Sequence, residues 1–140
     1  MQDLMTAISL WLSVTFGLPE PPTLPNIRHL DEQGMATLRF GRPGPARAND
    51  ILAVYDEPSQ TIMLRPGWSS GDIADLSVLV HEMVHHLQHH AGLVHACPQE
   101  RERLAYEAQD RWLRLFGEDL ESAFGLDRVM MMFMATCLPH

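Results

Sequence analysis

The sequence lacks an apolar run long enough to cross a membrane. Its longest apolar stretches, residues 8–16 and 129–138, are about half the length of a membrane-spanning helix. The first stretch also lacks the cationic start and the small-residue cleavage site of a signal peptide, because Asp3 stands where Lys or Arg would be expected. We therefore expect a chain that is neither inserted in a membrane nor exported, which predicts a cytoplasmic location.

Basic residues are few and scattered. The net charge is −8, and no cluster of Lys or Arg occurs anywhere in the sequence. Nucleic acids and anionic membrane surfaces attract proteins through such clusters. The composition therefore argues against both as partners.

Cysteine is also scarce, since Cys97 and Cys137 are the only two. A bridge between them would close a loop of about 40 residues, stabilise the fold by about 4 kcal/mol, and indicate a periplasmic or secreted protein from which a leader had been removed. In a reducing cytosol the two residues would instead be small buried apolar groups. The even count permits a bridge without requiring one.

No internal repeats or low-complexity tracts interrupt the chain, and 140 residues with 46% hydrophobic content suit one domain, residues 1–140, with a single core. The pattern predicts an α+β fold. Its expected elements before residue 70 are a helix over 3–16 that ends at Gly17, an irregular proline-rich stretch over 18–25, a strand over 35–40, a turn over 41–45 and a hairpin of 51–55 with 61–64.

The most informative segment is His81-Glu82-Met83-Val84-His85, an H-E-x-x-H pattern within an amphipathic helix. Asp72 or Ser70 can cap the start of this helix, and Gly92 can end it. Apolar residues recur at helical spacing and predict that one face packs against a core. They are Leu76, Leu79, Val80, Met83, Val84 and Leu87.

Residues four apart lie on the same face of a helix, so His81 and His85 can bind one zinc ion. Glu82 is then placed to take a proton from a zinc-bound water. A chance match is the alternative, because the segment is rich in histidine. We expect the remaining histidines of this segment to form a solvated face with no specific role. They are His86, His89 and His90.

A catalytic zinc needs a third protein ligand. A second helix, predicted from Pro98 to about Phe116, carries Glu102, Tyr106 and Gln109 on one face. We predict Glu102 as the third ligand. The other carboxylates of this helix are expected to be solvated, and they are Glu100, Glu107 and Asp110.

The motif followed by Glu102-Arg103-Leu104-Ala105 resembles the zinc metallopeptidases with a glutamate third ligand, the gluzincins and related membrane-associated and regulator-cleaving peptidases. The resemblance implies that Glu102 binds zinc. The residue after Ala, often Asp or Asn in those families, is Tyr106 here. A closer resemblance, to small bacterial H-E-x-x-H proteins of unassigned activity, rests on residues 79–88, Cys97-Pro98 and residues 105–109.

Together these features predict a small zincin-like α+β domain that acts as a zinc metallopeptidase. Water would complete the zinc site, and Glu82 would accept its proton during attack on a peptide carbonyl. Gln88 is a candidate either to orient a ligand or to line the cleft. The candidate donors to the developing oxyanion are Tyr106, His95 and Tyr55.

Three alternatives stay open at this point. The chain could be a zinc-stabilised binding or regulatory module that cleaves nothing, or a helical domain in which His81 and His85 belong to the core. The hairpin could bind an extended peptide at its edge or only cover the core. Methionines at 130, 131, 132 and 134 are expected to fill the core rather than to form a pliable binding surface.

Overall fold

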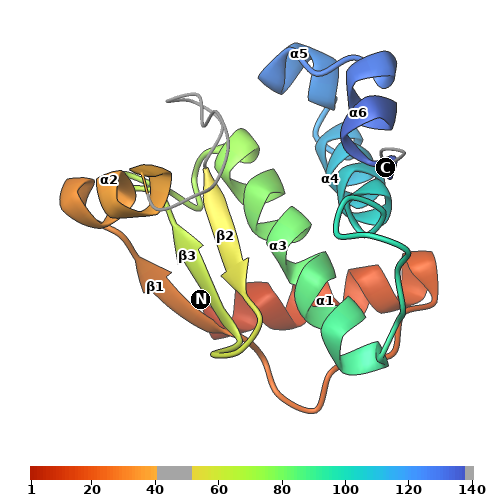
Figure 1. Cartoon of the computed structure of the whole chain (residues 1–140), viewed down its shortest axis with the longest axis horizontal. Helices are drawn as coiled ribbons and strands as arrows, with labels where there is room; N and C mark the ends of the chain where they lie inside the picture. Colours follow the sequence, from red (N-terminus) through yellow and green to blue (C-terminus); the bar gives the residue numbers. More distant parts are fainter. Residues whose placement is uncertain (41–51, 138–140) are drawn as a thin grey trace.

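The structure is a computed structural model that describes residues 1–40 and 52–137, except for the side chains of 38–40. Its described part is an α+β domain with helix α3 at the centre, between a small sheet on one side and α4 on the other (Figure 1). In chain order the elements are α1 (Gln2–Phe16), β1 (Asn26–His29), α2 (Glu32–Phe40), β2 (Ala53–Asp56), β3 (Thr61–Leu64), α3 (Ile73–Ala91), α4 (Glu102–Arg114), α5 (Leu120–Phe124) and α6 (Arg128–Met134).

The first helix and the proline-rich stretch follow the prediction. Helix α1 ends at Gly17, whose φ of 71° is the left-handed conformation that glycine adopts at low cost. Residues 18–25 have no regular structure. Helix α1 buries Ile8 and Leu12 against α3. The predicted single core is therefore built partly by the start of the chain.

The sheet is mixed, with the strand order β1-β3-β2. Strands β2 and β3 form the predicted antiparallel hairpin, although Ile51 lies outside the described residues. Strand β1 adds a parallel pairing to β3, with hydrogen bonds from Asn26 N–H to Gln60 O and from Leu30 N–H to Leu64 O, both 2.9 Å. The sequence pattern did not predict β1, because only Ile27 in it is partly buried and no alternation is visible.

The predicted strand over 35–40 is wrong, because these residues belong to helix α2. Asp31 starts this helix by accepting hydrogen bonds from Gly34 N–H through its side chain, at 2.6 Å, and from Met35 N–H through its carbonyl, at 3.0 Å. Met35 is buried beside Leu30. Capping by Asp31 favours a helix here more strongly than the short apolar run favours a strand. The turn predicted over 41–45 lies outside the described residues.

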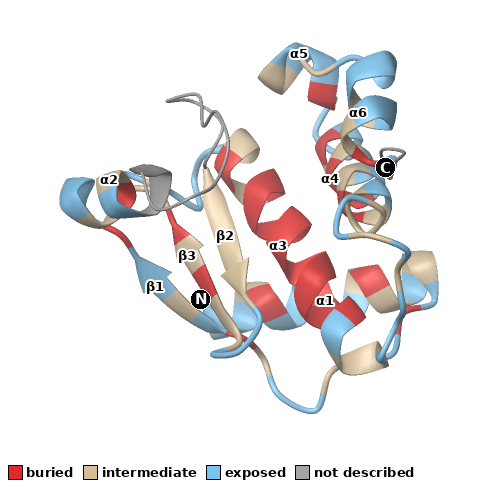
Figure 2. Ribbon diagram, in the orientation of Figure 1, coloured by how far each residue is buried: buried red, intermediate tan, exposed pale blue. Residues whose placement is uncertain are grey.

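Helix α3 has the predicted ends and the predicted core face. The Asp72 side chain accepts a hydrogen bond from Asp75 N–H, and Gly92 ends the helix with a φ of 67°. Of the six predicted core residues, five are fully buried and Leu76 is partly buried. Figure 2 shows buried positions along most of the helix. No helix among the described residues is both long and apolar enough to cross a membrane.

Helix α4 begins at Glu102 rather than at Pro98. The residues before it form turns, in which Glu100 N–H bonds to Cys97 O and Glu102 N–H bonds to Gln99 O, both at 3.1 Å. Bonds of this kind span three residues and do not continue as an α-helix. At the other end, Leu115 and Phe116 are exposed instead of lying on the predicted apolar face.

Cys97 and Cys137 form a disulfide with their Cα atoms 5.8 Å apart. The bridge ties Cys137, three residues beyond the end of α6, to the turns that lead into α4. Helix α6 itself has no buried residue, and Val129, Met132 and Phe133 are exposed. The expectation that its methionines fill the core is therefore wrong. The disulfide keeps α6 beside α4 without a buried apolar face.

Removing this bridge should lower the free energy of unfolding by up to about 4 kcal/mol, because a cross-link over about 40 residues restricts the unfolded chain. Urea unfolding of the oxidised protein and of a Cys97→Ser/Cys137→Ser variant measures the difference. Reductant should shift the wild-type midpoint and leave that of the double variant unchanged. Equal wild-type midpoints before and after complete reduction would show that the bridge adds no stability.

Candidate metal centre

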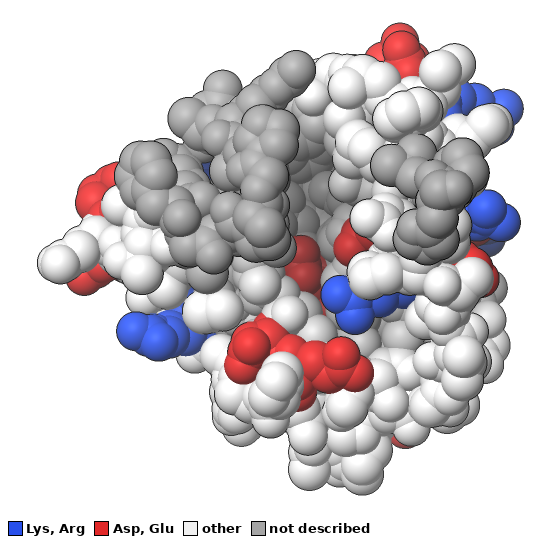
Figure 3. All heavy atoms as spheres, in the orientation of Figure 1, with Lys and Arg blue, Asp and Glu red and all other residues white. Residues whose placement is uncertain are grey.

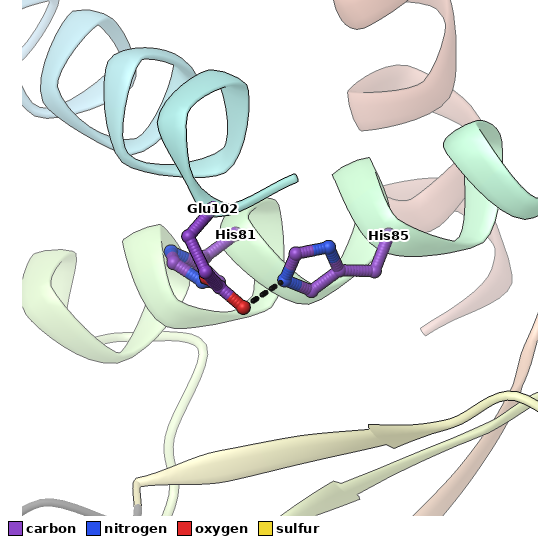
Figure 4. Close-up of side chains that lie close together, drawn as sticks. All are labelled: His81, His85 and Glu102. Atoms are coloured by element: carbon purple, nitrogen blue, oxygen red, sulfur yellow. Dashed lines mark hydrogen bonds and ion pairs between the residues drawn. The ribbon is translucent and has the colours of Figure 1, made fainter. Parts of the chain in front are cut away.

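The structure brings the three predicted zinc ligands together. His81 and His85 point from α3 toward the first residue of α4, Glu102, whose carboxylate lies between the two imidazoles (Figure 4). Glu102 Oε2 is 2.7 Å from His81 Nε2, and Glu102 Oε1 is 3.1 Å from His85 Nε2. One ligand atom from each residue lies within 4.8 Å of the other two. The predicted phase of the second helix is therefore correct, since it directs Glu102 to the motif.

The donor set and its spacing fit a zinc ion. Two imidazole nitrogens and one carboxylate oxygen form a three-ligand set of the type found in catalytic zinc sites. Donor atoms about 2.1 Å from a tetrahedral zinc are roughly 3.4 Å apart. The observed separations of 2.7 and 3.1 Å are slightly shorter. A small outward movement of Glu102 would accommodate the ion.

The electrostatics of the site keep the Glu102 side chain ionised. Burial by itself would raise the pKa of this carboxyl, but hydrogen bonds from His81 and His85 outweigh it and hold the pKa well below its usual range. Burial would lower the pKa of His85, yet its hydrogen bond with Glu102 and the negative charge of Glu82 raise that pKa overall. A charged carboxylate is the form that binds a metal.

Each histidine ligand has a glutamine behind it. His81 Nδ1 lies 2.9 Å from Gln109 Oε1, and His85 Nδ1 lies 3.0 Å from Gln88 Oε1. Gln88 was a candidate to orient a ligand or to line the cleft, and its contact with His85 matches the first role. The spacing placed Gln109 on the face of Glu102, but the sequence reasoning gave it no role. Both contacts turn the Nε2 atoms toward Glu102.

The proposed base, Glu82, lies beside the ligands. It is 8% exposed, and its charge acts on His85. Among residues 1–40 and 52–137 no hydrogen bond reaches its carboxylate, which leaves the group available to a water or a substrate. Figure 3 shows a hollow between the hairpin side and the α4 side of the molecule, with acidic atoms visible at its bottom.

The three candidate oxyanion donors have different surroundings. The Tyr106 ring packs edge-on against His81, with 4.7 Å between ring centroids, so this tyrosine borders the site. His95 lies in the loop before α4, and its Nε2 is buried without a hydrogen-bond partner in the described chain. Tyr55 instead hydrogen-bonds to His86 Nδ1 at 2.8 Å, which directs its hydroxyl away from the ligands.

Of the three histidines expected to form a solvated face, only His89 is exposed, while His90 is partly buried. His86 is fully buried, and its Nε2–H donates to the carbonyl of Thr23 at 2.7 Å. Nδ1 of His86 must then accept from the Tyr55 hydroxyl. Burial lowers the pKa of His86, and burial with the nearby charges of Glu57 and Asp56 raises the pKa of Tyr55 to about 12.

His89 and His90 contact the loop of the hairpin. His89 Nδ1 lies 2.6 Å from Glu57 Oε1, and His90 Nε2 lies 2.8 Å from Gln60 Oε1. The expectation for His86 and His90 overlooked the covering of α3 by residue 23 and by the hairpin loop. Their role in the structure is to fasten α3 to its neighbours.

The remaining carboxylates of the second helix region were expected to be solvated, which holds for Glu107 but not fully for Glu100 and Asp110, both partly buried. Glu107 is exposed and pairs with Arg111, and Asp110 pairs with Arg114. Glu100 accepts a hydrogen bond from Ala96 N–H at 3.2 Å.

Comparison with known proteins places the whole chain in one family. The sequence model of a domain of unknown function, DUF6647, matches residues 1–140. The chain belongs to this family. No curated protein and no solved structure matches it. Because the DUF6647 family has no described activity, the functional argument depends on the geometry of the site.

We expect one equivalent of zinc per chain, and we expect the His81→Ala/His85→Ala variant to lose it, because the remaining carboxylate cannot hold the ion alone. Metal analysis of protein purified without a His-tag measures the content. The matched control is His89→Ala/His90→Ala, which removes two histidines of the same helix and should keep the zinc. Near-stoichiometric zinc in the first variant and loss in the second would place the site on the other flank of α3.

Replacing Glu102, the predicted third ligand, should weaken zinc binding but not abolish it, because His81 and His85 remain. Glu102→Gln should raise the zinc dissociation constant at least about tenfold, whereas Glu107→Gln should barely change it. Competition with a chromophoric chelator measures both constants. The reverse result would mean that the other face of α4 meets the metal.

Proposed function

We propose that the chain is a zinc-dependent hydrolase, and specifically a metallopeptidase. The observation that carries this proposal is the convergence of His81, His85 and Glu102, with the carboxylate of Glu82 beside them and free of hydrogen bonds within the described chain. Metal binding alone does not need Glu82. Its position next to a ligand is the arrangement required for proton transfer.

The chemistry divides between the ion and the side chains. Zinc, when bound, would lower the pKa of a coordinated water and polarise a substrate carbonyl. Glu82 accepts the proton released when water adds to the carbonyl and returns it to the leaving amine. Glu102 stays ionised, and its negative charge offsets part of the charge of the ion. Burial of the two histidines keeps bulk water from competing for the ligand positions.

The carbonyl oxygen gains negative charge during the addition of water and needs a donor besides the metal. Tyr106 is the candidate that borders the ligands, because its ring packs on His81. A phenol hydroxyl can donate to an oxyanion. We assign this role to Tyr106 for its position against His81 and withdraw it from Tyr55, whose hydroxyl meets His86 rather than a predicted ligand.

An extended peptide suits the surroundings of the site. Strand β2 is the edge of the sheet as far as the chain is described, and it packs against α3. Figure 4 shows β2 passing beneath the two histidines. An edge strand offers unpaired N–H and C=O groups with which a substrate backbone can pair. This supports a peptide or protein substrate in preference to a small ester.

The disulfide bears on where the protein works. A cytoplasmic location was expected from the sequence, with a periplasmic or secreted one if Cys97 and Cys137 were bridged. Structural disulfides persist in oxidising compartments and are rare in the cytosol. The bridge therefore supports a periplasmic or secreted location over a cytoplasmic one.

Glu82→Gln separates an enzyme from a non-catalytic zinc module. The amide keeps the size of the side chain but cannot accept a proton, so zinc content and thermal stability should persist while hydrolysis falls by at least about a hundredfold. Digestion of a mixed peptide library and of a partially unfolded protein, followed by mass spectrometry, measures cleavage. Glu107→Gln, an exposed carboxylate change on α4, serves as the control and should cleave normally.

The outcomes of this experiment are distinct. Cleavage by the wild type that stops with a chelator and with Glu82→Gln supports the proposal. No cleavage by zinc-loaded wild type on either substrate would favour the binding or regulatory module. Cleavage that persists in Glu82→Gln would require another base or a contaminating protease.

A further inference from the structure

The hydrogen bonds behind the two histidine ligands have a fixed direction. Both Nδ1 atoms face the side-chain amide of a glutamine, and each amide makes a second hydrogen bond to another group. An imidazole nitrogen can donate or accept according to its protonation, and an amide can be turned either way. The second partner of each glutamine removes this ambiguity.

At His85 the direction is set by a backbone carbonyl. The amide of Gln88 lies 3.1 Å from the carbonyl oxygen of Arg101, and this oxygen can only accept. The NH₂ group of Gln88 must therefore face Arg101, so its oxygen faces His85 Nδ1 at 3.0 Å. An amide oxygen only accepts, and hence Nδ1 of His85 carries the hydrogen.

At His81 the direction of the hydrogen bond is also set by a backbone carbonyl, with the hydroxyl of Ser77 between that carbonyl and the glutamine. The hydroxyl of Ser77 lies 2.7 Å from the carbonyl oxygen of Ala74 and gives its only hydrogen to it. Ser77 Oγ must then accept from the amide NH₂ of Gln109, at 3.2 Å. The oxygen of Gln109 consequently faces His81 Nδ1, at 2.9 Å, and this nitrogen also carries the hydrogen.

We propose that Gln88 and Gln109 are positioning residues that keep a hydrogen on Nδ1 of both imidazoles. Zinc then displaces the hydrogen through which each Nε2 donates to Glu102 in this structure, and the Nδ1–H tautomer directs its Nε2 lone pair at the metal. The proposal rests on the proposed zinc site. It assigns the origin of the tautomers to two backbone carbonyls, those of Ala74 and Arg101, which act through the glutamines. No charge is added, because amides are neutral.

The two glutamines also join the helices that supply the ligands. Gln109 reaches from α4 to His81 and Ser77 on α3, and Gln88 reaches from α3 to the carbonyl of Arg101, the residue before Glu102. A shift of α4 along α3 would break both connections. The same amides that orient the histidines therefore hold the third ligand in register with them.

Neutral partners have a chemical consequence. Carboxylates behind metal-bound histidines raise the basicity of the imidazoles. Amides donate less electron density through the ring, so the ion keeps more of its charge. The arrangement suits a site that must polarise a carbonyl.

The direct test observes the wild-type protein, in which both glutamines are kept. Long-range ¹H–¹⁵N correlation spectra of ¹⁵N-histidine-labelled, zinc-loaded protein distinguish a metal-bound nitrogen from a protonated one, with His81→Ala and His85→Ala used for assignment. Nε2 coordination with a protonated Nδ1 at both ligands is the expected result. Coordination of either ligand through Nδ1 would overturn the proposal while leaving the zinc site standing. Wild-type protein that binds no zinc would instead overturn the proposed function.

Zinc affinity of variants tests the positioning role, with folding checked by circular dichroism. Gln88→Leu and Gln109→Leu should each weaken zinc binding about 10- to 100-fold, the range found for such partners. The matched control is Gln60→Asn, which shortens another glutamine bonded to a histidine, His90, away from the site. Asparagine tolerates the positive φ of position 60. Equal affinities in all four proteins would refute a positioning role.

Replacement by glutamate tests separately the hydrogen bonds that run from Ala74 to His81 and those that run from Arg101 to His85. Gln109→Glu still accepts from His81, and Ser77 can turn its hydroxyl to donate to the second oxygen, so zinc binding should be kept or strengthened. Gln88→Glu sets a carboxylate oxygen against the carbonyl of Arg101, where nothing can donate. Both changes add the same charge, so we expect Gln88→Glu to bind zinc at least about tenfold more weakly than Gln109→Glu. Equal affinities would show that the direction of the hydrogen bonds does not matter.

Discussion

The position of one carboxylate, that of Glu102 between two imidazoles, is the constraint to which the rest of the structure conforms. Placing three ionisable side chains together out of water is costly unless each is paired. Here they pair with one another and, through Nδ1, with two amides. The disulfide and the turns over 97–101 determine where α4 begins, and that start puts Glu102 opposite His81 and His85. The buried face of α3 supplies the rigid support.

Much of this site could be predicted because helical periodicity carries strong information. The apolar spacing of residues 76–87 fixed both the existence and the phase of α3, and capping by Asp72 and Gly92 fixed its ends. The same arithmetic applied to residues 102, 106 and 109 selected Glu102 and rejected Glu107. These arguments succeed because a helix of three or more turns places side chains at regular angles that depend little on the surroundings.

Most of the failures have a common physical cause, which is that tertiary partners decided the outcome. Strand β1 exists because β3 offers an unpaired edge. His86 was expected in solvent, yet the Thr23 carbonyl and Tyr55 satisfy it inside the protein. These partners are far away in the sequence, and the role of Gln109 emerged only with Ser77 beside it. Helix α2 is the exception, because its capping residue Asp31 is local and was not weighed against the apolar run.

The histidines of α3 that are not predicted metal ligands restrict the movement of the two that are. Apolar packing is non-directional and permits a helix to turn slightly about its axis, whereas hydrogen bonds are directional. His86, His89 and His90 attach one flank of α3 to residue 23 and to the hairpin loop. A ligand nitrogen about 6 Å from the helix axis moves by about 1 Å when the helix turns by about 10°. These attachments oppose that rotation, so the histidines bound to residue 23 and to the hairpin loop set the angular precision with which the neighbouring face presents its ligand nitrogens.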